Sequence, residues 1–264
     1  MLTLPTPHHK QLLRQSSPLP GHLAPRLIQP DLENGLAQLP LPSHRLSVAH
    51  DAHLDLIGEA WAHLHQVEPA IAAYAQRHIR FVFWMELRRE YWGEDERITS
   101  ASFPNWPGCV FISNKALVHI PPNTLFSAPS TWALAENLYH EAIHQEINQS
   151  ILRGEILSDD FDARTAPKVH ITWRKHQENR NQFWELDRCY HAAGVYAGLL
   201  NWRRQLLATA GAEDLDLERV THAAQEGQKS FEFLIERLSQ SENARYFTAT
   251  GQQNIHAFAK GVHV

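Results

Sequence analysis

The sequence from Ser130 to Arg153 reads STWALAENLYHEAIHQEINQSILR and predicts one long helix. Ser130 or Thr131 can act as its N-cap, because a hydroxyl oxygen accepts hydrogen bonds from the free N–H groups of a first turn. The pattern ends at Arg153-Gly154, and glycine is common just past a helix end. The apolar side chains form one stripe along this helix: Leu134, Leu138, Ile143, Ile147 and Ile151.

Two histidines lie one turn apart in this helix, and a glutamate follows the first of them. Residues four apart share a helix face with Cβ atoms about 5–6 Å apart, so His140 and His144 can converge on one divalent cation. Glu141 points about 100° away around the helix. With 18 His in 264 residues such a pentad can arise by chance, but its position inside an uninterrupted helix favours a metal site.

The third metal ligand decides which chemistry the site supports. Metzincins carry Gly and His at the third and sixth positions after the second His, where this chain has Ile147 and Ser150. Asp160 and Asp162 remain possible acidic ligands, but they lie in a polar segment typical of a loop. The sequence favours His191 as the third ligand.

The segment around His191 predicts a buried helix that another helix can approach closely. Small residues surround the histidine and remove side-chain bulk from its neighbourhood: Ala192, Ala193, Gly194, Ala197 and Gly198. Asp187 lies one turn before His191 on the same face. It is the runner-up ligand, or an acceptor that orients the imidazole of His191.

Several segments, in this order, resemble the 2-oxoglutarate-dependent HExxH peptide hydroxylases, an iron oxygenase family linked to ribosomal peptide natural products. The resemblance extends over roughly residues 50 to 260. The segments that resemble the family are 98–104 with 107–113 (its strand region), 138–144 (its metal helix), Trp173-Arg174, 190–197 (its distal helix) and 245–252 (its closing signature). The chain departs from the family in having Arg180-Asn181 where the family tends to have Arg-Pro, and in a longer gap before His191.

The resemblance implies that iron(II) is held by His140, His144 and His191, with positions left for 2-oxoglutarate and O₂. It also implies that an arginine binds the distal carboxylate of this co-substrate, because a guanidinium can bind both carboxylate oxygens at once. Arg174 is the first candidate and Arg180 the second. The implied reaction is hydroxylation of an unactivated C–H bond, at the β-carbon of an amino-acid residue in a peptide, with succinate and CO₂ as co-products.

Two other readings of the motif stay open. In a zinc-dependent metallopeptidase, Glu141 would be the catalytic general base that activates metal-bound water. In the oxygenase it is expected only to tune the site. A catalytically silent protein that binds a peptide precursor and keeps a structural metal is a further alternative.

Composition sets limits on the whole chain. An apolar content of 43% in 264 residues is enough for one substantial core. Eight of the 15 Pro fall in the first 42 residues, which predicts an extended Pro-rich arm over residues 1–44 and a single catalytic domain over residues 45–264. A net charge of −5 with dispersed Lys and Arg argues against nucleic acid as a partner. The expected partner is a peptide or an amino-acid-derived substrate, and the oligomeric state stays open.

The sequence also indicates the cellular compartment of the protein. No run of 18 apolar residues occurs and the N-terminus has no apolar signal region, so neither a membrane span nor secretion is expected. Two Cys without a CxxC pair suit a reducing compartment. We therefore expect a cytoplasmic protein.

The remaining patterns predict a mostly α (α+β) fold: a helical domain with a metal site between two core helices and a small antiparallel sheet. Helices are expected over residues 47–67, 69–80, 181–210, 216–238 and after 248. Strands are expected over 81–87, 110–113 and 116–120, the last two joined by a hairpin turn at Asn114-Lys115.

Overall fold

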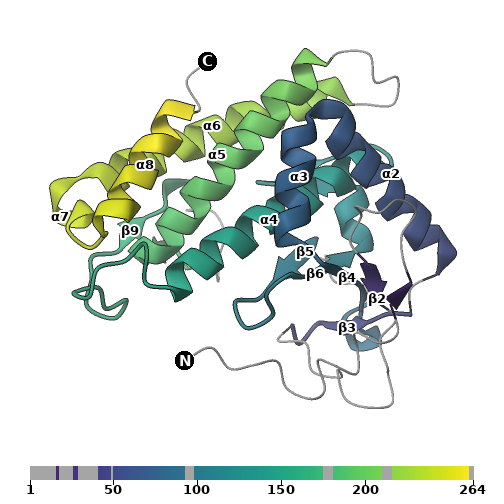
Figure 1. Cartoon of the computed structure of the whole chain (residues 1–264), viewed down its shortest axis with the longest axis horizontal. Coiled ribbons are helices and arrows are strands. Elements are labelled where there is room, and N and C mark those ends of the chain that lie inside the picture. The colour runs from purple at the N-terminus through teal and green to yellow at the C-terminus, as the bar shows by residue number, and fades with distance from the viewer. Residues whose placement is uncertain are drawn as a thin grey trace.

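The mostly helical class is confirmed. The computed structural model describes residues 16–17, 26–28, 41–48, 50–92, 98–174, 181–209 and 216–261. The helices of the described chain are α2 (Asp51–Val67), α3 (Pro69–His78), α4 (Thr131–Leu152), α5 (Leu186–Ala208), α6 (Leu217–Ser239), α7 (Ser241–Ala244) and α8 (Ala249–Gly261). In Figure 1 the sheet lies to one side, α5, α6 and α8 lie to the other, and α4 runs between them.

Several helix starts follow local capping rules. The Ser130 side chain accepts a hydrogen bond from the Trp132 N–H and caps α4, and Asp216 caps α6 in the same manner. Pro69 begins α3, where its missing N–H has no cost. Helix α5 begins at Leu186, several residues after the expected start, because Phe183–Trp184 form the short strand β10.

The main sheet is mixed rather than antiparallel at its centre. Strands β4 (Phe81–Leu87) and β6 (Cys109–Ser113) pair in parallel, from Phe81↔Cys109 to Met85↔Ser113. Strand β5 (Ser100–Ser102) adds antiparallel to β6, and β3 (His44–Leu46) adds antiparallel to β4. Two further small sheets are antiparallel pairs: β7 (His119–Ile120) with β8 (Thr124–Leu125), and β9 (Val169–His170) with β10.

The predicted hairpin at Asn114-Lys115 is wrong. Residues Asn114–Leu117 form a 3₁₀ turn, η3, because the Ser113 hydroxyl accepts a hydrogen bond from the Lys115 N–H and caps it. The chain then pairs His119 with Leu125 instead of returning along β6. Two other 3₁₀ turns, η2 (Arg89–Tyr91) and η4 (Thr172–Arg174), connect the larger elements.

Parts of the expected N-terminal arm are strands of the sheet. Strand β2 (Arg26–Ile28) pairs in parallel with the first residues of β4, and β1 (Ser16–Ser17) pairs antiparallel with β2. Strand β3, which begins at His44, takes the second half of the same β4 edge. The division into an arm and a catalytic domain stays a prediction.

Both faces of the central strands are buried, which matches their nearly continuous apolar sequence. Val82 and Trp84 of β4 point into the main core that the helices cover. Phe83 and Met85 point to the opposite face, where they join Phe111 in a smaller cluster. The main core therefore lies between the sheet and the helices, and α4 is its centre.

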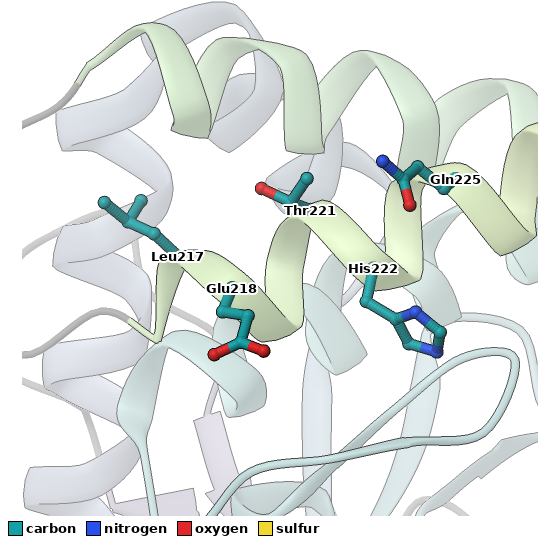
Figure 2. A pocket seen from close by; sticks show the side chains of 5 residues that line it. All are labelled: Leu217, Glu218, Thr221, His222 and Gln225. Atoms are coloured by element: carbon teal, nitrogen blue, oxygen red, sulfur yellow. The ribbon is translucent and has the colours of Figure 1, made fainter.

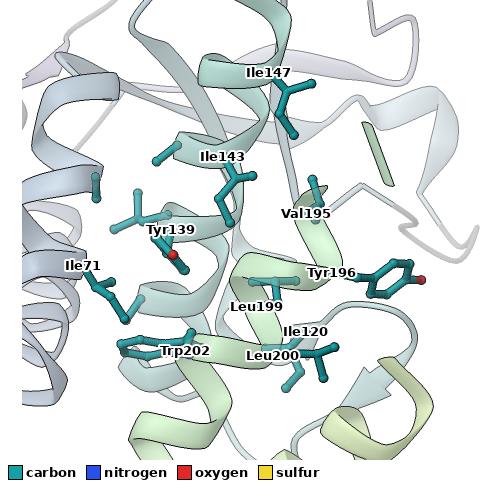
Figure 3. Packing of buried hydrophobic residues seen from close by; sticks show 14 of the residues in the cluster. Ile71, Ile120, Tyr139, Ile143, Ile147, Val195, Tyr196, Leu199, Leu200 and Trp202 are labelled. Atoms are coloured by element: carbon teal, nitrogen blue, oxygen red, sulfur yellow. The ribbon is translucent and has the colours of Figure 1, made fainter. Parts of the chain in front are cut away.

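Helix α4 contacts α2, α3 and α5 as well as β5, so it is buried around most of its circumference rather than along one stripe. The approach of α5 depends on two glycines, as expected for this small-residue segment. A Cβ on Gly198 would lie 2.4 Å from Ile143 Cδ1, and one on Gly194 would lie 2.7 Å from Ile147 Cδ1. Figure 3 shows these isoleucines of α4 beside Val195 and Leu199 of α5. No helix in the described ranges is long and apolar enough to cross a membrane.

Candidate metal centre

Helix α4 carries two parallel stripes of buried and half-buried polar side chains, each with members four residues apart. Such spacing places the members of a stripe on one helix face. Asn137, Glu141 and Gln145 are 0%, 2% and 1% exposed and face the sheet and its loops. Glu136, His140 and His144 form the neighbouring stripe. At its two ends it contacts Arg203 and His191, both on α5.

The first stripe anchors α4 to the strand layer. The Gln145 amide donates to Cys109 O at 2.8 Å and accepts from Gly108 N at 3.1 Å. The Asn137 amide donates to His119 O at 2.8 Å and to Ala116 O at 3.2 Å. These bonds fix the rotation of the helix about its axis, so the second stripe is turned toward α5.

The second stripe brings three imidazoles together from two helices. His144 Nε2 lies 2.7 Å from His140 Nε2, and His144 Nδ1 lies 2.6 Å from His191 Nε2. The rings therefore form a row with His144 in the middle. One ligand atom each from His140, Glu141 and His144 lie within 4.8 Å of one another, and this close group does not include His191.

Burial keeps these imidazoles neutral, which is the form that binds metal ions. Burial lowers the pKa of His144 to about 4. It lowers the pKa of His191 to about 3, with a smaller effect from the neighbouring His144. The pKa of His140 lies well below its usual value, first because of burial and then because of the two other rings, Arg203 and His119.

Glu141 is held on the side of the sheet. Its Oε1 accepts a hydrogen bond of 2.6 Å from the Ser100 hydroxyl on β5. Burial raises the pKa of this carboxyl to about 7, although the hydroxyls of Ser100 and Ser102 act in the opposite direction. Ser102 Oγ and Glu141 Oε2 have no hydrogen bond of normal geometry.

A pocket of about 330 Å³ opens beside the histidine row. His140, His144 and His191 line it together with Arg188 and with apolar or aromatic walls: Pro121, Trp184, Ala192, Val195 and Tyr196. The guanidinium carbon of Arg188 lies 4.5 Å from the centre of the Trp184 ring. The pocket thus combines neutral nitrogen donors, one cation and a mostly apolar lining, which is the usual composition of a small-molecule site.

Arg188 is a functional candidate that the sequence reasoning missed. Its signal was its position three residues before His191 on the same helix, which places both on one face. Of the expected co-substrate arginines, the backbone of Arg174 lies in η4 while its side chain is outside the described part of the structure. Arg180 lies outside the described residues altogether.

None of the acidic ligand candidates belongs to the close group of donor atoms formed by His140, Glu141 and His144. Asp162 accepts hydrogen bonds from the Arg164 guanidinium and from the Arg164 backbone N–H. Like His191, neither Asp160 nor Asp162 belongs to the close group found among the described residues. Asp187 lies on α5 outside that group too. Its Oδ1 is buried without a hydrogen-bond partner.

The donor set fits a divalent transition metal. Three neutral imidazole nitrogens are typical ligands of zinc or iron. His140 Nδ1 and Glu141 Oε2, both beside the row, are buried without hydrogen-bond partners, and a buried polar atom without a partner is uncommon in a folded protein. The residues present are therefore able to hold such an ion.

A second concavity, of about 390 Å³, lies on α6 (Figure 2). Leu217, Glu218, Thr221, His222 and Gln225 line it, all from the same helix. Because a single helix face supplies every lining side chain, it offers no convergence of groups from separate elements. The histidine pocket is the stronger candidate.

Comparison with known proteins adds no family. No protein-family model matches the chain, and no curated protein matches it at a significant level.

Proposed function

We propose that this chain is an iron(II)- and 2-oxoglutarate-dependent oxygenase that hydroxylates an unactivated C–H bond, at the β-carbon of a residue in a peptide of natural-product biosynthesis. In the balanced reaction, substrate C–H, 2-oxoglutarate and O₂ give substrate C–OH, succinate and CO₂. The observation that carries the proposal is the contact between His191 of α5 and His144 of α4 in a pocket that also contains Arg188.

His140, His144 and His191 are the proposed ligands. Bound iron would supply the O₂ chemistry, with coordination positions left for the keto acid. A single ion shared by all three rings requires the His144 ring to turn about its Cβ–Cγ bond, because its two nitrogens now face different neighbours. The neutral state of the three rings supports binding without prior loss of a proton.

Arg188 is the proposed partner of the distal carboxylate of 2-oxoglutarate. It lies one turn before His191 and lines the same pocket. Its guanidinium carbon lies 4.5 Å from the centre of the Trp184 ring, and a planar guanidinium suits bidentate binding of a carboxylate. The apolar walls, including Val195 and Pro121, suit the apolar part of a small-molecule substrate.

A zinc-dependent peptidase is the second candidate, because Glu141 is buried beside two histidine ligands with its pKa raised to about 7. A general base works best with a pKa near the working pH. Against it stands the Ser100 hydrogen bond, which directs one carboxylate oxygen of Glu141 to β5.

We also propose that the enzyme is cytoplasmic. Cys109 and Cys189 are both free thiols, which agrees with a reducing compartment.

An anaerobic titration tests the proposed function. Iron(II) and 2-oxoglutarate together should give a visible absorption band, because this band arises only when both are bound at one centre. Admission of O₂ should then give succinate. The variant His191→Ala should lose the band and succinate formation, while His222→Ala, at an exposed position of α6, should keep both. A wild-type protein that ignores 2-oxoglutarate but cleaves peptides with zinc bound would support the peptidase instead.

A further inference from the structure

Arg203 is a buried cation with hydrogen bonds to three other segments. Its side chain is fully buried in α5. The guanidinium binds both carboxylate oxygens of Glu136 on α4, at 2.5 and 3.2 Å, and donates to Ala223 O of α6 at 2.8 Å. It also donates to Pro121 O, in the turn that follows β7.

A charge removed from water is tolerated only when its hydrogen bonds are satisfied in good geometry. Arg203 therefore constrains the relative positions of α4, α5, α6 and the Pro121 turn. The close fit of α6 adds to this constraint, since a Cβ on Gly227 would lie 3.1 Å from Arg203 Nη1.

Two of these contacts lead directly to the histidine pocket. Glu136 belongs to the same stripe of α4 as His140 and His144 and lies one turn before the first of them. Pro121 lines the pocket beside all three histidines. The pocket wall and the metal-binding stripe are thus both held from one guanidinium.

The packing of α4 on α5 shows what Arg203 adds. The two helices run antiparallel, with Ile147 beside Gly194 and Ile143 beside Gly198. Apolar contacts are non-directional, so they specify the register of two helices less strictly than hydrogen bonds do. The polar contact between Glu136 and Arg203 fixes the register at one end, and the His144–His191 contact lies toward the other end.

We infer that Arg203, through Glu136 and Pro121, is a positioning residue that sets His140 and His144 against His191 and so defines the geometry of the metal centre. This inference rests on the proposed metal site. It assigns the buried ion pair a purpose beyond stability, which a buried pair often does not improve over apolar residues of similar size.

The test replaces the whole pair, so that no unpaired charge stays in the core. The double variant Glu136→Leu with Arg203→Met is compared with wild type and with Arg204→Met, a substitution of the neighbouring α5 arginine that contacts Gly261 O instead. A second pair, Glu136→Gln with Arg203→Gln, keeps hydrogen-bonding groups and serves if the apolar pair does not fold. Denaturation midpoints and titrations with cobalt(II) are measured on all proteins, because the cobalt absorption spectrum reports the ligand geometry.

We expect the folded double variant to keep a midpoint near wild type, to bind cobalt(II) about tenfold or more weakly, and to show a changed cobalt spectrum. Arg204→Met should match wild type in all three. A folded double variant with the wild-type affinity and spectrum would overturn the inference, since the pair would then be purely structural. Absence of cobalt binding by wild type would instead overturn the proposed metal site, so the two failures are distinguishable.

Discussion

Glu141 is the residue whose role separates the two candidate enzyme classes. It lies between the two histidines of α4 in sequence, yet its carboxylate accepts the Ser100 hydroxyl on β5. An anchoring group and a general base respond differently to loss of charge. In the proposed oxygenase, Glu141→Gln should keep iron binding and reduce succinate formation by about tenfold to a hundredfold, the usual cost of changing a group next to metal ligands. Iron content and succinate yield are the measurements.

The partner hydroxyl provides the control for this prediction. Ser100→Ala should cost about 1–3 kcal/mol of unfolding free energy, because it leaves a buried carboxylate oxygen without a partner. With Glu141→Gln it should show a coupling of about 0.5–3 kcal/mol in a double-mutant cycle. Complete loss of turnover in an iron-loaded, folded Glu141→Gln variant, with full activity in Ser100→Ala, would instead identify Glu141 as a base.

Arg188 is the second residue with a clear expectation. In the proposed function, the Arg188 guanidinium binds the distal carboxylate of 2-oxoglutarate. Arg188→Lys keeps the positive charge but loses the bidentate contact and the contact of the guanidinium with the Trp184 ring. We expect the KM for 2-oxoglutarate to rise by at least about tenfold, equivalent to about 1.4 kcal/mol, with iron affinity unchanged. Arg204→Lys is the matched control on the same helix. An unchanged KM in Arg188→Lys would contradict this role for Arg188 and favour Arg174 as the residue that binds the distal carboxylate.

At the scale of elements, the spacing of α4 and α5 depends on glycine. Gly198→Ala places a methyl group 2.4 Å from Ile143 Cδ1, so it should destabilise the fold by about 1–3 kcal/mol and weaken metal binding by separating the helices. Gly58→Ala is the matched control in α2, because nothing lies within 4 Å of its Cβ position. That change should stabilise the protein by about 0.5–1 kcal/mol.

A second substitution tests whether the clash with Ile143 causes the losses expected for Gly198→Ala. Ile143→Val removes the Cδ1 atom that Gly198→Ala would meet, so the double variant should recover metal affinity and part of the lost stability. Chemical denaturation and metal titration measure the two effects. Equal losses with and without Ile143→Val would show that the helix spacing does not depend on this contact.

The elements that could be predicted are those with local signals. Capping at Ser130 and Asp216, Pro at the start of α3 and the glycines of α5 each act within a few residues of where they occur. The meeting of His191 with His144 was predicted from the need for a third ligand, which is a chemical rather than a local argument.

The parallel pairing of β4 with β6 depends on contacts between distant segments, so no local signal encodes it. The polar stripe of Asn137, Glu141 and Gln145 could not be predicted for a similar reason. Its partners are strand and loop backbone groups, which have no sequence signature. Arg188 belongs to none of the residue pairs that carry the family resemblance, so the sequence pattern points to Arg174 and Arg180 instead.

At the scale of the whole molecule, buried histidines make stability depend on pH. Burial is the main cause of the lowered pKa values of His53, His63 and His78, and of the three histidines of the metal centre. Below about pH 6.5 the unfolded chain takes up protons at these groups more readily than the folded chain does. Their contribution to stability is therefore full above this pH and is lost as the pH falls. Glu141 has the opposite effect on stability. Its pKa is raised to about 7, so as the pH falls the folded chain takes up this proton before the unfolded chain does.

Six histidines act in one direction and Glu141 in the other, so the metal-free protein should be less stable at pH 5.5 than at pH 7.5. Urea denaturation midpoints at the two pH values measure the difference. His63 stacks on Trp132 and contacts the Thr131 hydroxyl, so His63→Gln should reduce the difference, whereas His222→Gln at an exposed position should not. A higher midpoint at pH 5.5 would mean that the buried histidines accept protons in the folded state, and the neutral row proposed to bind the metal would then be wrong.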